Sequence, residues 1–133
     1  MNLHGKIVVI TGASSGLGSQ FSQSLIEQGA RVYGLARRKK KLDELEKNLG
    51  HSFVEIECDI SLEKKVEAAF KHILDIEGRI DVLVNNAEIG KFEPADEVSV
   101  ADWDLQMNVN LREVFLCTRA VLPAMKAQNE ETG

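Results

Sequence analysis

The sequence predicts an α/β fold in which a doubly wound parallel sheet carries helices on both faces. Short apolar runs alternate along the chain with longer stretches whose apolar residues recur at helical spacing. The first junction between such a run and such a stretch holds three glycines, Gly12, Gly16 and Gly18. The chain has 133 residues, of which 44% are hydrophobic, and can therefore bury one core. We expect a single domain over residues 1–133 with the strand order 3-2-1-4.

Each expected element has a local signal in the sequence. Continuous apolar runs predict strands at 6–10, 30–36, 52–58 and 80–85. Helical periodicity predicts helices at 21–28, 39–50 and 62–78, the last of them between the caps Ser61 and Gly78. Ser99 and Asp102 resemble a capping box, from which one long helix runs through Leu122. The strand-helix alternation indicates right-handed crossovers.

Charge and cysteine content exclude several classes of function. The formal net charge is -5 and both signs are mixed along the chain, so no field would attract nucleic acid or an anionic membrane. No apolar run is long enough for a signal peptide or a membrane span, which predicts a soluble, cytoplasmic protein. Cys58 and Cys117 lack the spacing of metal ligands and are interpreted as buried thiols. We expect no metal site.

The glycine-rich turn after the first strand is typical of a phosphate-binding site. Free N–H groups and the positive end of the dipole at a helix N-terminus favour a pyrophosphate there. Gly12 would allow a tight turn, Gly16 a close approach of the backbone to a phosphate, and Gly18 close packing of the helix on the sheet. A glycine-rich turn without a ligand is the alternative interpretation.

Basic residues follow the second strand, where a dinucleotide places its adenosine ribose. Arg37 and Arg38 stand where an NAD-preferring site carries an acid. Because cations oppose the dipole at a helix N-terminus, an anion such as a ribose 2′-phosphate would stabilise them. This favours NADP(H) over NAD(H), while Lys39 to Lys41 are interpreted as a solvated charge run.

Polar residues also follow the third and fourth strands. Asp59 can accept a hydrogen bond from the exocyclic amine of adenine, or can cap the next helix beside Ser61. Asn85 and Asn86 end the fourth strand, beside the first strand at the topological switch point. Their amides can tie loop backbones together or contact a ribose.

Taken together, these residues resemble the short-chain dehydrogenase/reductase family over essentially the whole chain. The segment Thr11–Gly18 is similar to the family's T-G-x-x-x-G-x-G turn, Asp59 and Ile60 to its adenine contacts, and "NNA" to most of its N-N-A-G motif. The resemblance implies a Rossmann-like fold, NAD(P)-dependent alcohol or carbonyl chemistry, and a role for Asn110 as the asparagine of the catalytic tetrad. The cofactor-binding residues it implies are Gly12, Ser14, Ser15, Gly16, Leu17, Gly18, Arg37, Arg38, Asp59, Ile60, Asn86 and Ala87.

Three departures from the family pattern stand out. Glu88 and Glu113 occupy positions that are usually glycine in the family. At Glu88 the resemblance implies a carboxylate near the nicotinamide ribose and the phosphates. The family's serine and Y-x-x-x-K are missing from these 133 residues, whose single tyrosine, Tyr33, lies in an expected strand and is interpreted as a packing residue. None of the three histidines has a nucleophile or acid arranged around it.

We therefore expect the amino-terminal, cofactor-binding portion of a dehydrogenase, inactive alone, whose carbonyl or alcohol substrate binds only in a full-length form. A stand-alone nucleotide-binding module and a fold remnant are the alternatives. We also expect self-association, because an apolar strand edge and the Trp103 to Met125 helix would otherwise be exposed.

Overall fold

The fold is built around a four-stranded parallel sheet in the order β3-β2-β1-β4. A computed structural model describes the chain except residues 1, 15, 38–46, 91 and 132–133. Each expected strand overlaps an observed one, and the predicted strand order is confirmed. The strands are β1 (Ile7–Thr11), β2 (Arg31–Ala36), β3 (Phe53–Glu57) and β4 (Val82–Val84).

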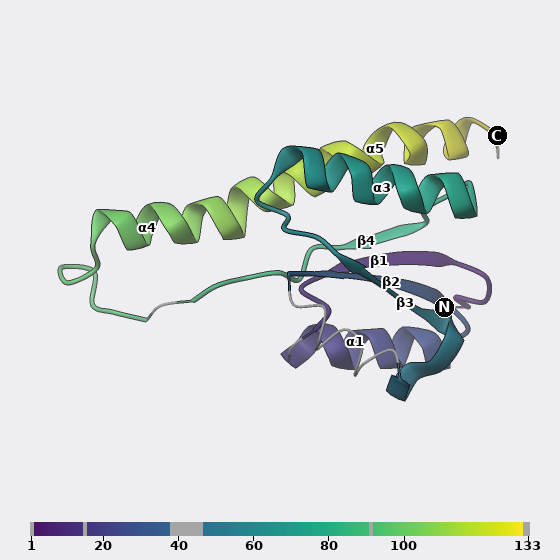
Figure 1. The fold of residues 1–133 in the computed structure, drawn as a ribbon, viewed down its shortest axis with the longest axis horizontal. Helices are drawn as coiled ribbons and strands as arrows, with labels where there is room; N and C mark the ends of the chain where they lie inside the picture. Colours follow the sequence, from purple (N-terminus) through teal and green to yellow (C-terminus); the bar gives the residue numbers. More distant parts are fainter. Residues whose placement is uncertain (1, 15, 38–46, 91, 132–133) are drawn as a thin grey trace.

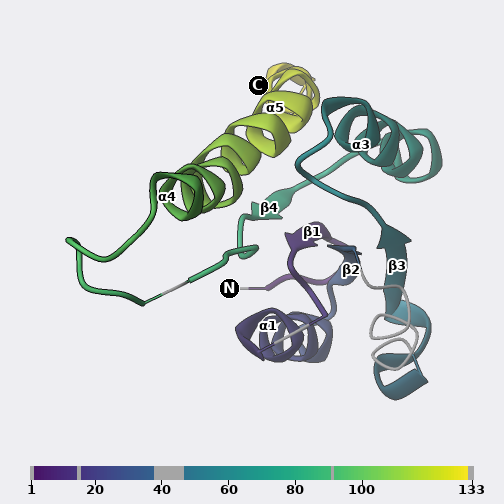
Figure 2. The same cartoon turned by 60° about the vertical axis from the view of Figure 1, so that its left-hand side comes forward.

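Helices cover both faces of this sheet. Figures 1 and 2 show α1 below the strands and α3 and α5 above them, while α4 extends beyond the sheet. Most of the expected helix at 39–50 lies outside the described residues. In the part that is described, residues 47–49 are helical. The helical segments are α1 (Gly16–Glu27), η1 (Gly50–Ser52), α3 (Glu63–Glu77), α4 (Val100–Met107), η2 (Asn108–Arg112) and α5 (Glu113–Glu131).

Side chains at alternate positions along the strands point to opposite faces of the sheet, and each face carries its own apolar cluster. Val8 and Ile10 join the cluster beneath α1, together with Val32 and Phe53. Val9 joins the larger cluster on the opposite face, which contains both cysteines and is packed by α3 and α5. Cys58 and Cys117 are buried free thiols, as predicted. Tyr33 is a packing residue, also as predicted: it is fully buried, and its hydroxyl donates to Glu77 Oε1 at 2.5 Å.

Local capping signals predicted two helix ends correctly and one incorrectly. Ser99 Oγ accepts from Asp102 N at 3.1 Å at the start of α4, and Gly78 ends α3 with φ 71°. The prediction that Ser61 caps α3 is wrong, because the N-cap is Leu62 and no side chain bonds there. Ser61 instead donates from its hydroxyl to Asp59 Oδ1 at 2.6 Å. Its side chain is therefore turned back toward the strand end.

The long final helix is interrupted where a continuous helix was expected. Between α4 and α5 the backbone widens into the π-helical segment η2, which contains Asn110. The side chain of Asn110 makes two hydrogen bonds to the backbone of Ile89, in the loop after β4. The π-segment thus coincides with a long-range contact, which helical periodicity does not report.

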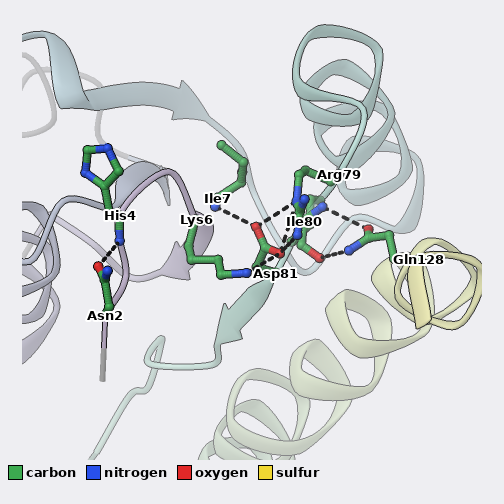
Figure 3. Close-up of polar contacts among 8 residues, drawn as sticks. All are labelled: Asn2, His4, Lys6, Ile7, Arg79, Ile80, Asp81 and Gln128. Atoms are coloured by element: carbon green, nitrogen blue, oxygen red, sulfur yellow. Dashed lines mark hydrogen bonds and ion pairs between the residues drawn. The ribbon is translucent and has the colours of Figure 1, made fainter. Parts of the chain in front are cut away.

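The amino ends of the central strands are tied together by a polar cluster (Figure 3). Asp81 accepts from the N–H of Ile7 at 2.9 Å and is ion-paired with Arg79. Gln128, on α5, donates to the carbonyl of Ile80 at 3.0 Å and accepts from its N–H at 3.1 Å. These contacts join β1, β4 and α5 at the sheet end opposite the site described below.

Candidate functional site

A cleft of about 440 Å³ opens at the carboxyl ends of the four strands. The loops that leave parallel strands at this edge commonly form ligand sites in open α/β sheets. Here the cleft is bounded by the turn after β1, the end of β2, the segment after β3, the loop after β4 and the η2–α5 junction. Its lining residues are Gly12, Ser14, Leu17, Leu35, Ala36, Arg37, Cys58, Ile60, Asn86, Ala87, Glu88, Ile89, Val109 and Glu113.

Two of the three glycines in the first turn are required by contacts within the protein. Gly12 has φ +64°, and a Cβ added there would lie 2.8 Å from the Cα of Ala87. A Cβ on Gly18 would lie 2.3 Å from the carbonyl oxygen of Gly12 and 2.6 Å from Asn86 Nδ2. Gly18 therefore packs against the turn and Asn86. Both glycines let two loops meet without intervening side chains.

Gly16 stands in a different environment. Its φ is +50°, yet an added Cβ would meet no atom within 4 Å. Gly16 begins α1, whose first turn carries no acidic residue. An open space over a helix N-terminus without a local anion fits a phosphate group.

Hydrogen bonds hold the loop after β4 against the turn after β1. Thr11 Oγ1 accepts from the N–H of Asn86 at 3.0 Å and from that of Ala87 at 3.1 Å. Asn86 Nδ2 in turn donates to the carbonyl of Gly12 at 3.2 Å. Asn86 therefore ties the two loops together, which was one of its two predicted roles. Asn85 points elsewhere, toward Thr118 Oγ1 at 3.4 Å.

The structure gathers part of the predicted set of cofactor residues around the cleft. Ser15 and Arg38 lie outside the described residues. Gly16, Gly18, Asp59 and Asn110 are not among the residues that line the cleft. The predicted residues that do line it are Gly12, Ser14, Leu17, Arg37, Ile60, Asn86 and Ala87.

Asp59 is engaged with its own loop. Its Oδ1 accepts from the N–H of Ser61 at 3.0 Å and from the Ser61 hydroxyl at 2.6 Å. The hydrogen bond from the Ser61 hydroxyl is the main cause that lowers the pKa of Asp59. The alternative that Asp59 caps the next helix is wrong, because the N-cap of α3 is Leu62 and no side chain bonds there. Asp59 instead orders the turn before α3 through Ser61.

Asn110 is held in place by backbone bonds. Its Nδ2 donates to the carbonyl of Ile89 at 2.8 Å, and its Oδ1 accepts from the N–H of the same residue at 2.9 Å. Asn110 also lines a smaller pocket with Leu17 and residues 85–88. Its side chain therefore fixes the loop after β4 to the helix at η2.

Several residues that line the cleft were not predicted from the sequence. Leu35 and Ala36 directly precede the predicted Arg37, and Cys58 precedes the predicted Asp59, so proximity to the strand ends was an available signal. Val109 and Glu113 are four residues apart, a spacing that places side chains on one face of a helix. Glu88, which was expected near the cofactor, lines the cleft, and so does Glu113, for which no role was predicted from the sequence.

Glu113 is the buried acid of this site. Glu113 is 5% exposed. Its carboxylate makes no hydrogen bond or ion pair with any part of the chain that the structure describes. Burial, followed by repulsion from Asp59, raises its pKa from 4.5 to about 6, although Arg37 and Arg112 oppose this shift. A carboxyl in this state marks a candidate binding residue, because strongly shifted groups in clefts are often functional.

Comparison with known proteins places this geometry in a family. The sequence model described as short chain dehydrogenase matches residues 6–133. The BbsD subunit of (2S)-[(R)-hydroxy(phenyl)methyl]succinyl-CoA dehydrogenase from Thauera aromatica is 37% identical over 125 residues, which are 91% of this chain and 50% of that protein. NADP-dependent 3-hydroxy acid dehydrogenase YdfG from Escherichia coli strain K12 is 35% identical, over 92% of this chain and 50% of its own. The chain thus spans about half the length of these relatives.

Solved structures with the same arrangement include cofactor complexes. A 3-ketoacyl-(acyl-carrier-protein) reductase from Brucella melitensis, complexed with NADH, matches with a TM-score of 0.93 and 35% identity over 98% of this chain and 54% of its own. A metagenomic short-chain oxidoreductase in complex with NADP matches with a TM-score of 0.88 and 38% identity, over 96% of this chain and 60% of its own. Both cofactors therefore occur among the structural relatives.

The described residues contain neither a cluster of metal ligands nor a membrane-spanning helix. Across the described ranges, no group of three or more His, Cys, Asp or Glu side chains is arranged to hold a metal ion. Among the helices of that same part of the chain, none combines the length and the apolar character needed to cross a membrane.

Removing the charge of Glu113 should stabilise the fold in a pH-dependent way. Because the folded pKa lies above 4.5, the folded chain takes up a proton between about pH 4.5 and 6, and stability falls as pH rises through that window. The shift corresponds to at most about 2 kcal/mol at neutral pH, from about 1.4 kcal/mol per pKa unit, and solvent in the open cleft reduces this figure. Glu113→Gln should therefore gain stability over the wild type as pH rises from 5 to 8, measured by urea unfolding.

The matched control is Glu67→Gln, which neutralises an exposed carboxylate on α3. We expect its stability relative to the wild type to change little between the two pH values. A Glu113→Gln gain of equal size at pH 5 and pH 8 would contradict burial of the charged form.

Proposed function

Because the chain belongs to the short-chain dehydrogenase family, we propose that it is the cofactor-binding portion of an NADP(H)-dependent oxidoreductase acting on alcohol or carbonyl groups. The observation that carries the cofactor preference is the position of Arg37, which follows β2 directly and lines the cleft. A guanidinium there suits a ribose 2′-phosphate, whereas an acid would suit a ribose hydroxyl. The NADP-dependent name of YdfG and the NADP complex of the metagenomic relative support this preference.

The residues of the cleft, together with the N-terminus of α1 between the lining residues Ser14 and Leu17, fit a dinucleotide along its length. The open N-terminus of α1 at Gly16 would hold the pyrophosphate, Arg37 the 2′-phosphate and Ile60 one face of the adenine. Ala87 and the loop tied by Asn86 would support the nicotinamide ribose. A bound nicotinamide would supply hydride transfer, and this chain would orient it.

A nucleotide-binding module without chemistry is the second candidate function. Carbonyl reduction needs a proton donor near the carbonyl oxygen. The only tyrosine of the 133 residues is Tyr33, and its buried hydroxyl already donates to Glu77. We propose that the acid of the complete enzyme belongs to a segment outside these residues, as the serine and Y-x-x-x-K of the family do.

Reversing the charge of Arg37 tests the cofactor assignment. The wild type should bind NADPH more tightly than NADH by about 1.5–3 kcal/mol, or about 10- to 150-fold, because a charge-assisted bond to the 2′-phosphate is added. Arg37→Asp should narrow or reverse this ratio in calorimetric titrations. Lys126→Asp makes the same charge change on an exposed residue of α5 and should leave the ratio unchanged. Equal affinities of the wild type for both cofactors would count against the assignment.

The 133-residue chain alone should reduce no carbonyl at a measurable rate, even when NADPH is bound. General acid catalysis contributes about 10²- to 10⁴-fold and orientation of bound reactants more, so the absence of both leaves background rates. The assay follows NADPH absorbance with ketones, aldehydes and quinones. A turnover that Asn110→Ala abolishes would show that these residues contain a proton donor of their own.

We also propose that a second copy of the chain covers the apolar face of α4, η2 and α5. Trp103, Leu111 and Phe115 are 55%, 66% and 57% exposed on this face. Leu111→Glu should weaken self-association in light scattering at high micromolar concentration, because it places a charge in the contact. Ile76→Glu, at a 55% exposed residue of α3, is the control and should not weaken it. A monomeric wild type would refute the proposal.

A further inference from the structure

Five apolar residues line the part of the cleft between β2, β3 and α5. Leu35 and Ala36 come from the end of β2, Cys58 and Ile60 from the segment after β3, and Val109 from η2. These side chains can enclose a flat aromatic ring. Glu113 is the acid that lines the cleft beside them.

Glu113 has no hydrogen-bonding partner within the described protein. It is 5% exposed and lines the cleft, so a ligand in the cleft can reach it. An ionised carboxylate can only accept hydrogen bonds, and a buried one without donors is costly. The Glu113 carboxylate therefore lacks a hydrogen-bond donor, and a ligand in the cleft could provide one.

Asp59, the other acid nearby, does not line the cleft. One of its two carboxylate oxygens, Oδ1, accepts two hydrogen bonds from Ser61. Its negative charge is nevertheless close enough to Glu113 to disfavour ionisation of that group. Of these two acids, Glu113 is the one that lines the cleft beside the apolar residues, where a ring would lie.

We propose that Glu113 accepts a hydrogen bond from the exocyclic amine of the cofactor's adenine and so selects adenine over bases that carry an oxygen there. This inference rests on the proposed function, because it assumes that a dinucleotide binds in the cleft. The exocyclic N6 amine is the donor on the adenine edge, beside acceptor ring nitrogens. In hypoxanthine a carbonyl oxygen replaces the amine, and this oxygen would face the carboxylate without a proton between them.

The test compares NADPH with its hypoxanthine analogue, reduced nicotinamide hypoxanthine dinucleotide phosphate. Calorimetric titration at pH 8 keeps Glu113 largely ionised, since its pKa is about 6. The wild type should prefer NADPH by about tenfold or more, as expected for a hydrogen bond to a charged group. Glu113→Gln should narrow or reverse this preference, because its amide can donate to the hypoxanthine oxygen.

Two further variants keep the result interpretable. Glu113→Leu has no polar group and should lose the discrimination without reversing it. Glu88→Gln neutralises another carboxylate that lines the same cleft, in the loop after β4, and should keep the wild-type ratio. A Glu113→Leu chain that binds both dinucleotides equally would support the assignment even if Glu113→Gln failed to fold.

The outcomes separate this inference from the function it rests on. If the wild type binds NADPH but Glu113→Gln and Glu113→Leu keep the wild-type ratio, the role of Glu113 is refuted and the proposed function stands. If the folded wild type binds neither dinucleotide, the proposed function fails and the adenine assignment fails with it. If Glu88→Gln changes the ratio as much as Glu113→Gln does, the effect is one of cleft charge and the specific contact is refuted.

Discussion

The pair of hydrogen bonds accepted by Thr11 Oγ1 is the contact on which the rest of the site depends. The two donors, the N–H groups of Asn86 and Ala87, are 75 and 76 residues away in the sequence. By holding the loop after β4 against the end of β1, they bring Ala87 close enough that position 12 has no room for a Cβ. The carbonyl of Gly12 then receives Asn86 Nδ2, and the same amide leaves no room for a side chain at Gly18. The Thr11 hydroxyl thus positions Asn86 and Ala87, which line the cleft.

The sheet could be predicted from the sequence because its signals are local. Each strand is a short apolar run followed by a stretch of helical period, and right-handed crossovers restrict the strand order. Gly78 and Ser99 end and begin helices through bonds to residues within four positions, which a capping pattern reports. Ser61 was assigned wrongly by the same logic, because the competing acceptor Asp59 lies as near in the sequence as the helix does.

The site was harder to predict because its decisive contacts join distant residues. Gly12 was attributed to a tight turn and Gly18 to packing on the sheet, but the residues that leave no room for a Cβ at these positions, Ala87 and Asn86, lie far along the chain. Gly16, which was attributed to a phosphate, is the one of the three that faces open space. The π-helical segment at Asn110 accompanies bonds to Ile89, 21 residues earlier in the chain. Helical periodicity describes one element at a time and carries no information about such a bond.

The cleft contains a carboxyl group whose ionised form the folded chain disfavours. Glu113 sits among apolar walls that disfavour its ionised form, and Asp59 adds to that penalty. Arg37 and Arg112 reduce the penalty from a distance without forming an ion pair with it. A smaller residue without charge, such as the glycine usual in the family, would avoid the penalty altogether. The described part of the chain therefore gives this carboxylate no hydrogen bond, and the open side of the cleft is where a donor could compensate it.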